Sequence, residues 1–155
     1  MGFTAPSLKG RALRLLSQRE HSRDELRRKL ARHVQEGEDL EAVLDDLQAK
    51  DFISEARVVE STVHRRASRL GAARIRQELQ AKGVAPDLVQ QAVAGLHETE
   101  FARAHALWAR RFDALPGDAR ERGRQGRFLL TRGFSGEVIH RVLRGEVPDD
   151  RDSQA

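Results

Sequence analysis

The sequence predicts an all-α protein built from three tandem three-helix repeats. The first observation is a recurring anchor: Leu30, Leu79 and Leu129 lie 49 and 50 residues apart, and apolar positions on either side of them fall into register. The second is that no segment alternates apolar and polar residues as a half-buried strand does. Each repeat must therefore bury its core with helices alone.

The last helix of each repeat follows the anchor. Apolar residues there recur at i, i+3, i+4 and i+7 in the first two copies and at the first three of these positions in the third, so each set lies on one helix face. They are Leu40, Val43, Leu44 and Leu47, then Val89, Ala92, Val93 and Leu96, then Ile139, Val142 and Leu143.

The middle helix contains the anchor itself. Leu26 and Ile75 lie one turn earlier and share its face, whereas the third copy has Gln125 there. Gly83 and Gly133 follow their anchors by four residues, where a helix ending in a left-handed residue favours glycine. The first copy has Val34 at this place, so its turn is expected to close differently, through Gly37.

Capping signals agree with this division. Ser22 and Glu25 have the spacing of a capping box, Asp118 and Glu121 have an analogous spacing, and Pro86 suits a first helical turn. The first helix of each copy is expected at 8–18, 54–69 and 100–112, which gives nine helices in all. In the last of these, a stripe of apolar residues predicts a packed core seam in preference to a cofactor site: Phe101, Ala104, Trp108 and Phe112.

These patterns divide the chain into an N-terminal tail at 1–7, repeats at 8–51, 52–97 and 98–145, and a C-terminal tail at 146–155. The last segment is acidic and poor in apolar residues, so we expect it to be disordered.

Composition indicates a cytoplasmic protein. There is no cysteine, no apolar run of membrane-spanning length and no signal-like N-terminus. The formal net charge is +4, and only four of the 28 basic residues are lysine. Guanidinium groups suit phosphate and carboxylate partners, although high-GC coding bias explains the same excess of arginine equally well.

The sequence offers no motif for catalysis, a metal or a cofactor. None of the six histidines is four residues from another, and the glycines at 123 and 126 follow no strand and precede no lysine with serine or threonine. An enzyme is therefore not expected. The carboxylates of one helix suggest a solvated face or a docking surface for a basic partner: Glu38, Asp39, Glu41, Asp45 and Asp46.

Basic residues recur on the middle helix of every copy. Two readings stay open: a continuous positive track along the array, or ordinary solvated helix faces. The residues are Arg23, Arg27, Arg28, Lys29 and Arg32, then Arg74, Arg76 and Lys82, then Arg120, Arg122, Arg124, Arg127 and Arg132.

Four runs of the sequence resemble the RecX family of recombination regulators, and together they span nearly the whole chain in order. They are ALRLLSQREHSRDELRRKL at 12–30, EAVLDDLQAKDFISEARVVES at 41–61, RIRQELQAKGV at 74–84 and GRFLLTRGFSGEVIHRVL at 126–143. The resemblance implies an elongated, curved helical array that binds RecA filaments in their helical groove and inhibits ATP hydrolysis and strand exchange. It implies no cofactor and no membrane partner. Val34 and Gln125 depart from the repeat pattern, which leaves local turns and packing open.

We expect a monomer that also binds single-stranded or duplex DNA weakly and without sequence preference. Position on the basic helices, and no transferred motif, selects six candidates for RecA or DNA contact: Arg27, Arg28, Arg74, Arg76, Arg124 and Arg127. The plain alternative is that some of them only form intrahelical pairs, such as Arg74 with Glu78.

Two other functions compete with this one. A helix-turn-helix-like module could bind DNA without RecA, although the acidic helix at 38–46 is poorly suited to base recognition. A helical scaffold for other proteins could instead use the acidic helix and tail for docking.

Overall fold

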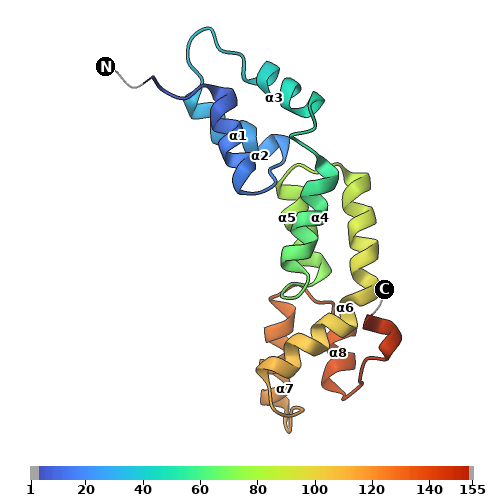
Figure 1. Cartoon of the computed structure of the whole chain (residues 1–155). Helices are drawn as coiled ribbons and strands as arrows, with labels where there is room; N and C mark the ends of the chain where they lie inside the picture. Colours follow the sequence, from blue (N-terminus) through green and yellow to red (C-terminus); the bar gives the residue numbers. More distant parts are fainter. Residues whose placement is uncertain (1–3, 154–155) are drawn as a thin grey trace.

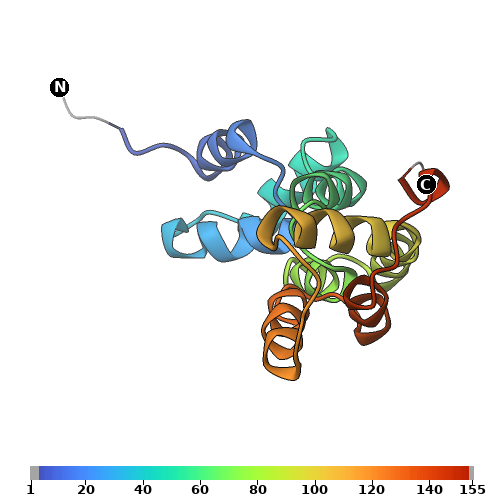
Figure 2. The same ribbon diagram turned by 90° about the horizontal axis from the view of Figure 1, so that it is seen from below.

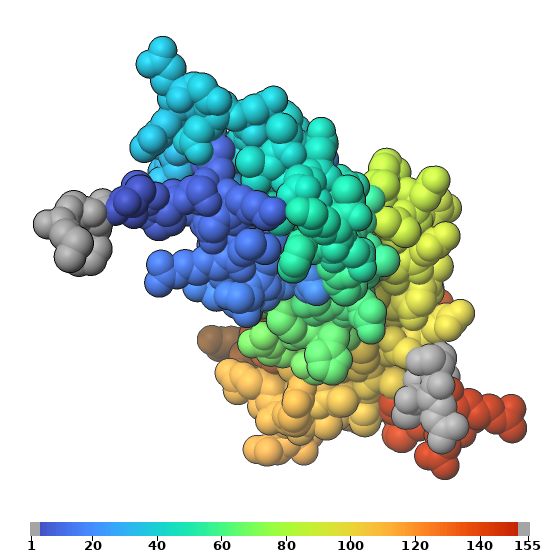
Figure 3. Space-filling view, turned by 45° about the horizontal axis from the view of Figure 1, so that its top comes forward, coloured from blue at the N-terminus to red at the C-terminus, as the bar shows by residue number. Residues whose placement is uncertain are grey.

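A computed structural model describes residues 4–153 and shows an elongated, curved array of helices (Figure 1). Eight α-helices and two short 3-10 helices occur in this range, and no strand does. The chain runs from the first unit at one end to the third at the other, as the space-filling view also shows (Figure 3). The predicted all-α, repeated architecture is confirmed, and we retain 8–51, 52–97 and 98–145 as the proposed units.

The first unit consists of α1 (Leu8–Gln18), α2 (Arg23–Leu30), the 3-10 helix η1 (Ala31–His33) and α3 (Leu40–Ala49). Its α-helices begin with side-chain caps, and the predicted capping box of Ser22 and Glu25 is present. The anchor Leu30 lies in a buried cluster with Leu8, Ala12, Leu26, Leu44, Leu47 and Ile53. Helix α1 thus packs on α2 and α3, the two helices whose apolar faces were predicted from the periodicity.

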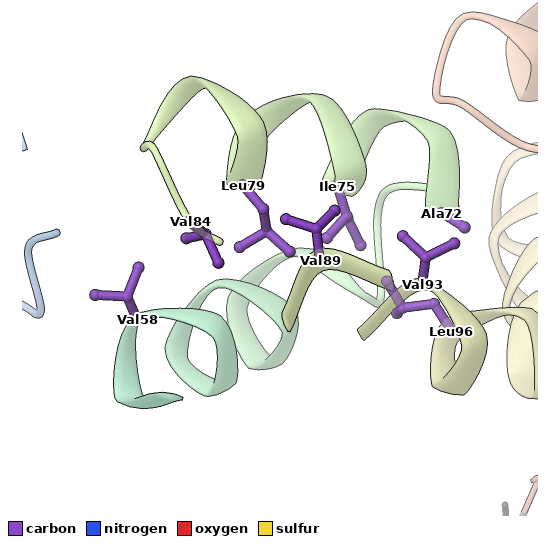
Figure 4. Packing of buried hydrophobic residues seen from close by; sticks show 8 residues of the cluster. All are labelled: Val58, Ala72, Ile75, Leu79, Val84, Val89, Val93 and Leu96. Carbon is purple, nitrogen blue, oxygen red and sulfur yellow. The ribbon is translucent and has the colours of Figure 1, made fainter. Parts of the chain in front are cut away.

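The second unit comprises α4 (Glu55–Arg66), α5 (Ala72–Ala81) and the first half of α6 (Pro86–Arg111). Its core interleaves one face of α5 with the start of α6 (Figure 4). The buried residues are Val58, Ala72, Ile75, Leu79, Val84, Val89, Val93 and Leu96. Aliphatic side chains therefore suffice for a unit of this size.

The third unit shares α6 with the second and adds α7 (Ala119–Leu130) and α8 (Gly136–Leu143). The predicted core seam is confirmed, because Phe101, Ala104, Trp108 and Phe112 are buried with Leu129, Phe134, Val142 and Leu143. The predicted cap is also present, since the Asp118 carboxylate accepts from the Glu121 amide at 2.7 Å.

The prediction of nine separate helices is wrong at one place. The last helix of the second unit and the first of the third form the single 26-residue α6. Between Leu96 and Phe101 there is neither glycine nor proline to end the helix. Glu100 is buried at this junction, and its Oε1 accepts from the Ala72 amide at the start of α5 at 3.2 Å.

Glycines form the joints between consecutive units. Gly83 and Gly133 have φ angles of +76° and +89°, as a left-handed helix end requires. Each lies against the middle helix of the preceding unit: a Cβ on Gly83 would collide with the Asp24 side chain, and one on Gly133 would lie 2.6 Å from the Arg74 amide nitrogen. The Arg132 and Gly133 carbonyls also accept from the Gly71 and Ala73 amides.

The turn of the first unit departs from the pattern and is not packed against another unit of the described residues. Val34 occupies the place of the joint glycines and is 39% exposed. Its turn closes through Gly37, with φ of +83°, as the sequence predicted. A Cβ on Gly37 would meet no heavy atom within 4 Å.

The two tails are short. Residues 1–3 of the expected N-terminal tail lie outside the described residues, and Ser7 caps α1. Of the segment expected to be disordered at 146–155, Asp150–Ser153 forms the 3-10 helix η2 against α6, and residues 154–155 lie outside the described range. The segment that leads into α1 and the 3-10 helix η2 lie on opposite sides of the molecule (Figure 2).

Candidate functional site

The six arginines singled out from the sequence are distributed over α2, α5 and α7, one pair to each unit. Each helix buries its anchor side and turns its arginines outward. The pairs do not converge on one site. Their surroundings differ enough to divide them into arginines bound by carboxylates, arginines bound by backbone carbonyls, and arginines without such partners.

In the first unit, Arg27 is neutralised by its own unit. Its Nε donates to Glu41 at 2.6 Å, and its Nη1 donates to Asp24 at 2.6 Å. Hydrogen bonds from Arg27 and Arg23 hold the pKa of Glu41 at about 2. Arg27 is therefore poorly placed to recognise another anion.

The carboxylates of the predicted acidic face of α3 have hydrogen-bond or ion-pair partners within the first unit. Asp39 caps the helix, and Asp45 accepts from Arg23 at 2.6 Å. Asp46 binds Lys9 and Lys50, both at 3.1 Å. Cations of the same unit thus bind Asp45 and Asp46, and the distance along the sequence between Arg23 and Asp45 and between Lys9 and Asp46 had hidden these ion pairs.

Arg28 and Arg74 connect neighbouring units through backbone carbonyls. The Nη2 of Arg28 donates to the Ala81 carbonyl at the end of α5 at 3.1 Å. The Nη1 of Arg74 donates to the Thr131 carbonyl at the end of α7 at 2.7 Å. The alternative pairing of Arg74 with Glu78 is wrong, because Glu78 binds Arg66 at 3.2 Å.

Arg76 and Arg127 are exposed, and neither side chain makes a hydrogen bond or an ion pair within residues 4–153. Arg124, in contrast, binds Glu121 at 2.9 Å and lies 5.1 Å from the centre of the Phe112 ring. Of the six candidates, Arg76 and Arg127 are thus the two whose full hydrogen-bonding capacity remains open to a partner.

Sequence reasoning missed a basic groove on the first unit. It has a volume of about 780 Å³ and lies between α1, α2 and η1. Its cations are Arg11, Arg14, Arg28, Lys29 and Arg32. The i, i+3 spacing of Arg11 and Arg14 was the available signal, but only the packing of α1 beside α2 brings the two helices' cations together.

The imidazole of His21 helps to position one wall of this groove. His21 is buried, its Nδ1 lies 3.0 Å from the Arg19 carbonyl, and its Nε2 lies 3.0 Å from Lys29 Nζ. Burial lowers the pKa of His21, so the neutral ring donates from Nδ1 and accepts from the Lys29 ammonium.

Residues 4–153 hold neither a metal site nor a membrane-spanning helix. No group of three or more His, Cys, Asp or Glu side chains there could hold a metal ion. No helix in the same range has the length and apolar character needed to cross a bilayer.

Comparison with known families gives three consecutive matches. Residues 9–47 match the first three-helix domain of RecX, residues 54–93 the second and residues 98–143 the third. The three matches agree in order with the three helical units of the fold.

Two proteins similar to this chain along most of its length are both named regulatory protein RecX. The regulatory protein RecX of Leptothrix cholodnii is 59% identical over 138 residues, which are 89% of this chain and 88% of that protein. The regulatory protein RecX of Herminiimonas arsenicoxydans is 52% identical over 144 residues, 93% of this chain and 95% of its own length. The likeness therefore extends along almost the full length of both proteins.

Solved structures share the fold at lower identity. The crystal structure of RecX from Lactobacillus salivarius superposes with a TM-score of 0.71 and 22% identity, covering 90% of this chain and 94% of that one. A second crystal structure of regulatory protein RecX gives a TM-score of 0.72 at 23% identity, covering 87% of this chain and 70% of that one.

Proposed function

The chain belongs to the RecX family of regulatory proteins, and from this premise we propose that it inhibits a RecA recombinase by lodging in the helical groove of the RecA–DNA filament. The family consists of regulators and not of enzymes. The protein acts in the cytoplasm as a monomer, needs no cofactor, and lowers ATP hydrolysis, strand exchange and recombinational DNA repair by occupying space and contacting several protomers.

The observation that carries this proposal is the jointed array. Three units follow one another through the same glycine contact, so the chain is an extended body and not a single globule (Figure 1). An extended body can touch successive repeats of a filament, and several weak contacts then add up to tight binding. A helical groove is the surface that such a shape fits.

The electrostatics of the array support a contact with filament-bound DNA. Arg76 and Arg127 extend from two consecutive units without internal partners among the described residues. A guanidinium in this state can bind a phosphate bidentately without first breaking an ion pair. Such contacts predict weak, salt-dependent DNA binding without sequence preference.

The test is the DNA-dependent ATP hydrolysis of RecA from the same organism, titrated with this protein. We expect inhibition at amounts well below those of RecA, since one chain contacts several protomers. The double variant Arg76→Glu with Arg127→Glu should need about tenfold more protein for the same inhibition, corresponding to ~1.4 kcal/mol of lost binding.

The matched control is Arg120→Glu with Arg122→Glu, which makes the same change of net charge on exposed residues of α7. Neither side chain makes a hydrogen bond or ion pair within the described residues, and Arg122 lies on another side of the helix from Arg127. This double variant should inhibit like the unsubstituted protein. Equal inhibition by all variants would remove Arg76 and Arg127 from the contact surface, and unchanged hydrolysis with the unsubstituted protein would contradict the proposed function.

A further inference from the structure

The basic groove of the first unit gathers five cations, and none of them forms an ion pair within residues 4–153. Arg11 and Arg14 make no side-chain hydrogen bond or ion pair among residues 4–153. Arg28 donates to a backbone carbonyl, Lys29 lies against neutral His21, and Arg32 Nε lies 3.3 Å from His33 Nε2. Within residues 4–153 no carboxylate lines the groove itself, and Glu38 lines an adjoining cavity with Arg11 and Arg32.

The other side of the same unit contrasts with the groove. There Arg23, Arg27 and Lys9 each bind at least one carboxylate of the unit at 3.1 Å or less. The charges of the unit are thus segregated: carboxylates and cations neutralise each other around α3, while five cations remain together between α1 and α2. Clustered like charges repel one another, so an anionic ligand in the groove would relieve this cost.

The floor of the groove indicates what kind of anion fits. Leu15, Leu30 and Pro6 line it, and of these Pro6 is exposed and Leu15 half-buried, so these two offer an apolar surface among the cations, whereas Leu30 belongs to the buried core. Among the lining residues the only aromatic ring is that of His33, so the groove lacks the stacking platforms on which single-stranded nucleic acids place their bases. A volume of about 780 Å³ is within the range of ligand pockets.

We propose that this groove binds an acidic segment of a partner protein, with an apolar side chain of the segment on Leu15 and Pro6 and flanking carboxylates on Arg11, Arg14 and Arg32. The chain's own acidic C-terminal segment is not the occupant within one molecule, because η2 packs on α6 at the other end of the array (Figures 1 and 2). The segment that precedes α1, dark blue in Figure 3, lies at the end of the array that holds the first unit and its groove.

The proposal does not rest on the function proposed above, and its test contains no RecA. The probe is a short fluorescent peptide of alternating Asp, Glu and Leu, and binding to the full chain is followed by anisotropy. The double variant Arg11→Glu with Arg14→Glu should bind the peptide at least about tenfold more weakly. Its far-UV circular dichroism should be unchanged, because neither side chain makes a hydrogen bond or an ion pair within the described part of the chain.

Two controls separate this site from general attraction to a basic protein. Arg120→Glu with Arg122→Glu makes the same change of net charge on exposed residues of α7, and it should alter peptide binding by less than about twofold. Replacing the leucines of the peptide by serine tests the apolar floor on the unsubstituted protein, and it should weaken binding about tenfold.

Three results would overturn the proposal. The first is no binding of the acidic peptide to the unsubstituted protein. The second is equal binding of the leucine and serine peptides, or equal effects of the two double variants. The third is binding of an oligo-dT strand that depends on Arg11 and Arg14 while the peptide fails to bind, since the groove would then be a nucleic-acid site.

Discussion

At the scale of single residues, Gln125 shows how a break in the repeat pattern is resolved. It occupies the place of Leu26 and Ile75 and is just as buried. Its Oε1 accepts from the Trp108 indole at 2.7 Å, and its Nε2 donates to the Ala114 carbonyl at 3.1 Å. The third unit thus gains the large aromatic surface of Trp108 and satisfies its polar nitrogen inside the core.

Replacing Gln125 by Leu should therefore destabilise the protein in spite of restoring the repeat pattern. The buried Trp108 nitrogen loses its acceptor, which costs about 1–3 kcal/mol in the free energy of unfolding. Urea unfolding followed by circular dichroism measures this change.

The same substitution in a Trp108→Phe background provides the control. With no indole nitrogen to satisfy, Gln125→Leu should then cost ~1 kcal/mol or less. Equal costs in both backgrounds would show that the hydrogen bond between Trp108 and Gln125 contributes nothing to stability.

At the scale of helices, local signals predicted most of the structure. The caps at Ser22 and Asp118, the turn glycines and the buried faces were all legible because they depend on residues within one or two turns. The continuous α6 was missed because repeat symmetry suggested a break that no glycine or proline enforces. A repeat pattern thus predicts packing faces better than it predicts where a helix ends.

The candidate site was predictable only in part, for a physical reason. Helix periodicity places Arg27 and Arg28 on an outer surface, but it does not show that Glu41 neutralises the first while the second reaches the next unit. These partners are 14 and 53 residues away along the chain. The groove cations Arg11 and Arg14 were overlooked for the same reason, since α1 and α2 become neighbours only in the folded unit.

At the scale of the whole molecule, two glycine joints set the shape of the array. Gly83 and Gly133 are equivalent in sequence and perform the same task, since each lets a turn approach the middle helix of the unit before it. Val34, at the equivalent place of the first unit, is 39% exposed and lies against no other unit among residues 4–153, so no close approach there requires a glycine.

A joint variant with a matched control tests this role. Gly133→Ala and Gly37→Ala both place a methyl group at a positive φ, which costs about 1 kcal/mol. Only Gly133→Ala also drives that methyl group into Arg74 of the preceding unit. It should lower the urea midpoint clearly more than Gly37→Ala does and should broaden the distance distribution measured by small-angle X-ray scattering. Similar midpoints for both variants would mean that close packing at the joint is dispensable.

The most direct test of the central claim, binding to the recombinase filament, is co-sedimentation with RecA assembled on single-stranded DNA. We predict that this protein pellets with the filament at substoichiometric amounts and stays in the supernatant with RecA alone or DNA alone at physiological salt. If it remains in the supernatant when complete filaments are present, the proposed mode of regulation is wrong.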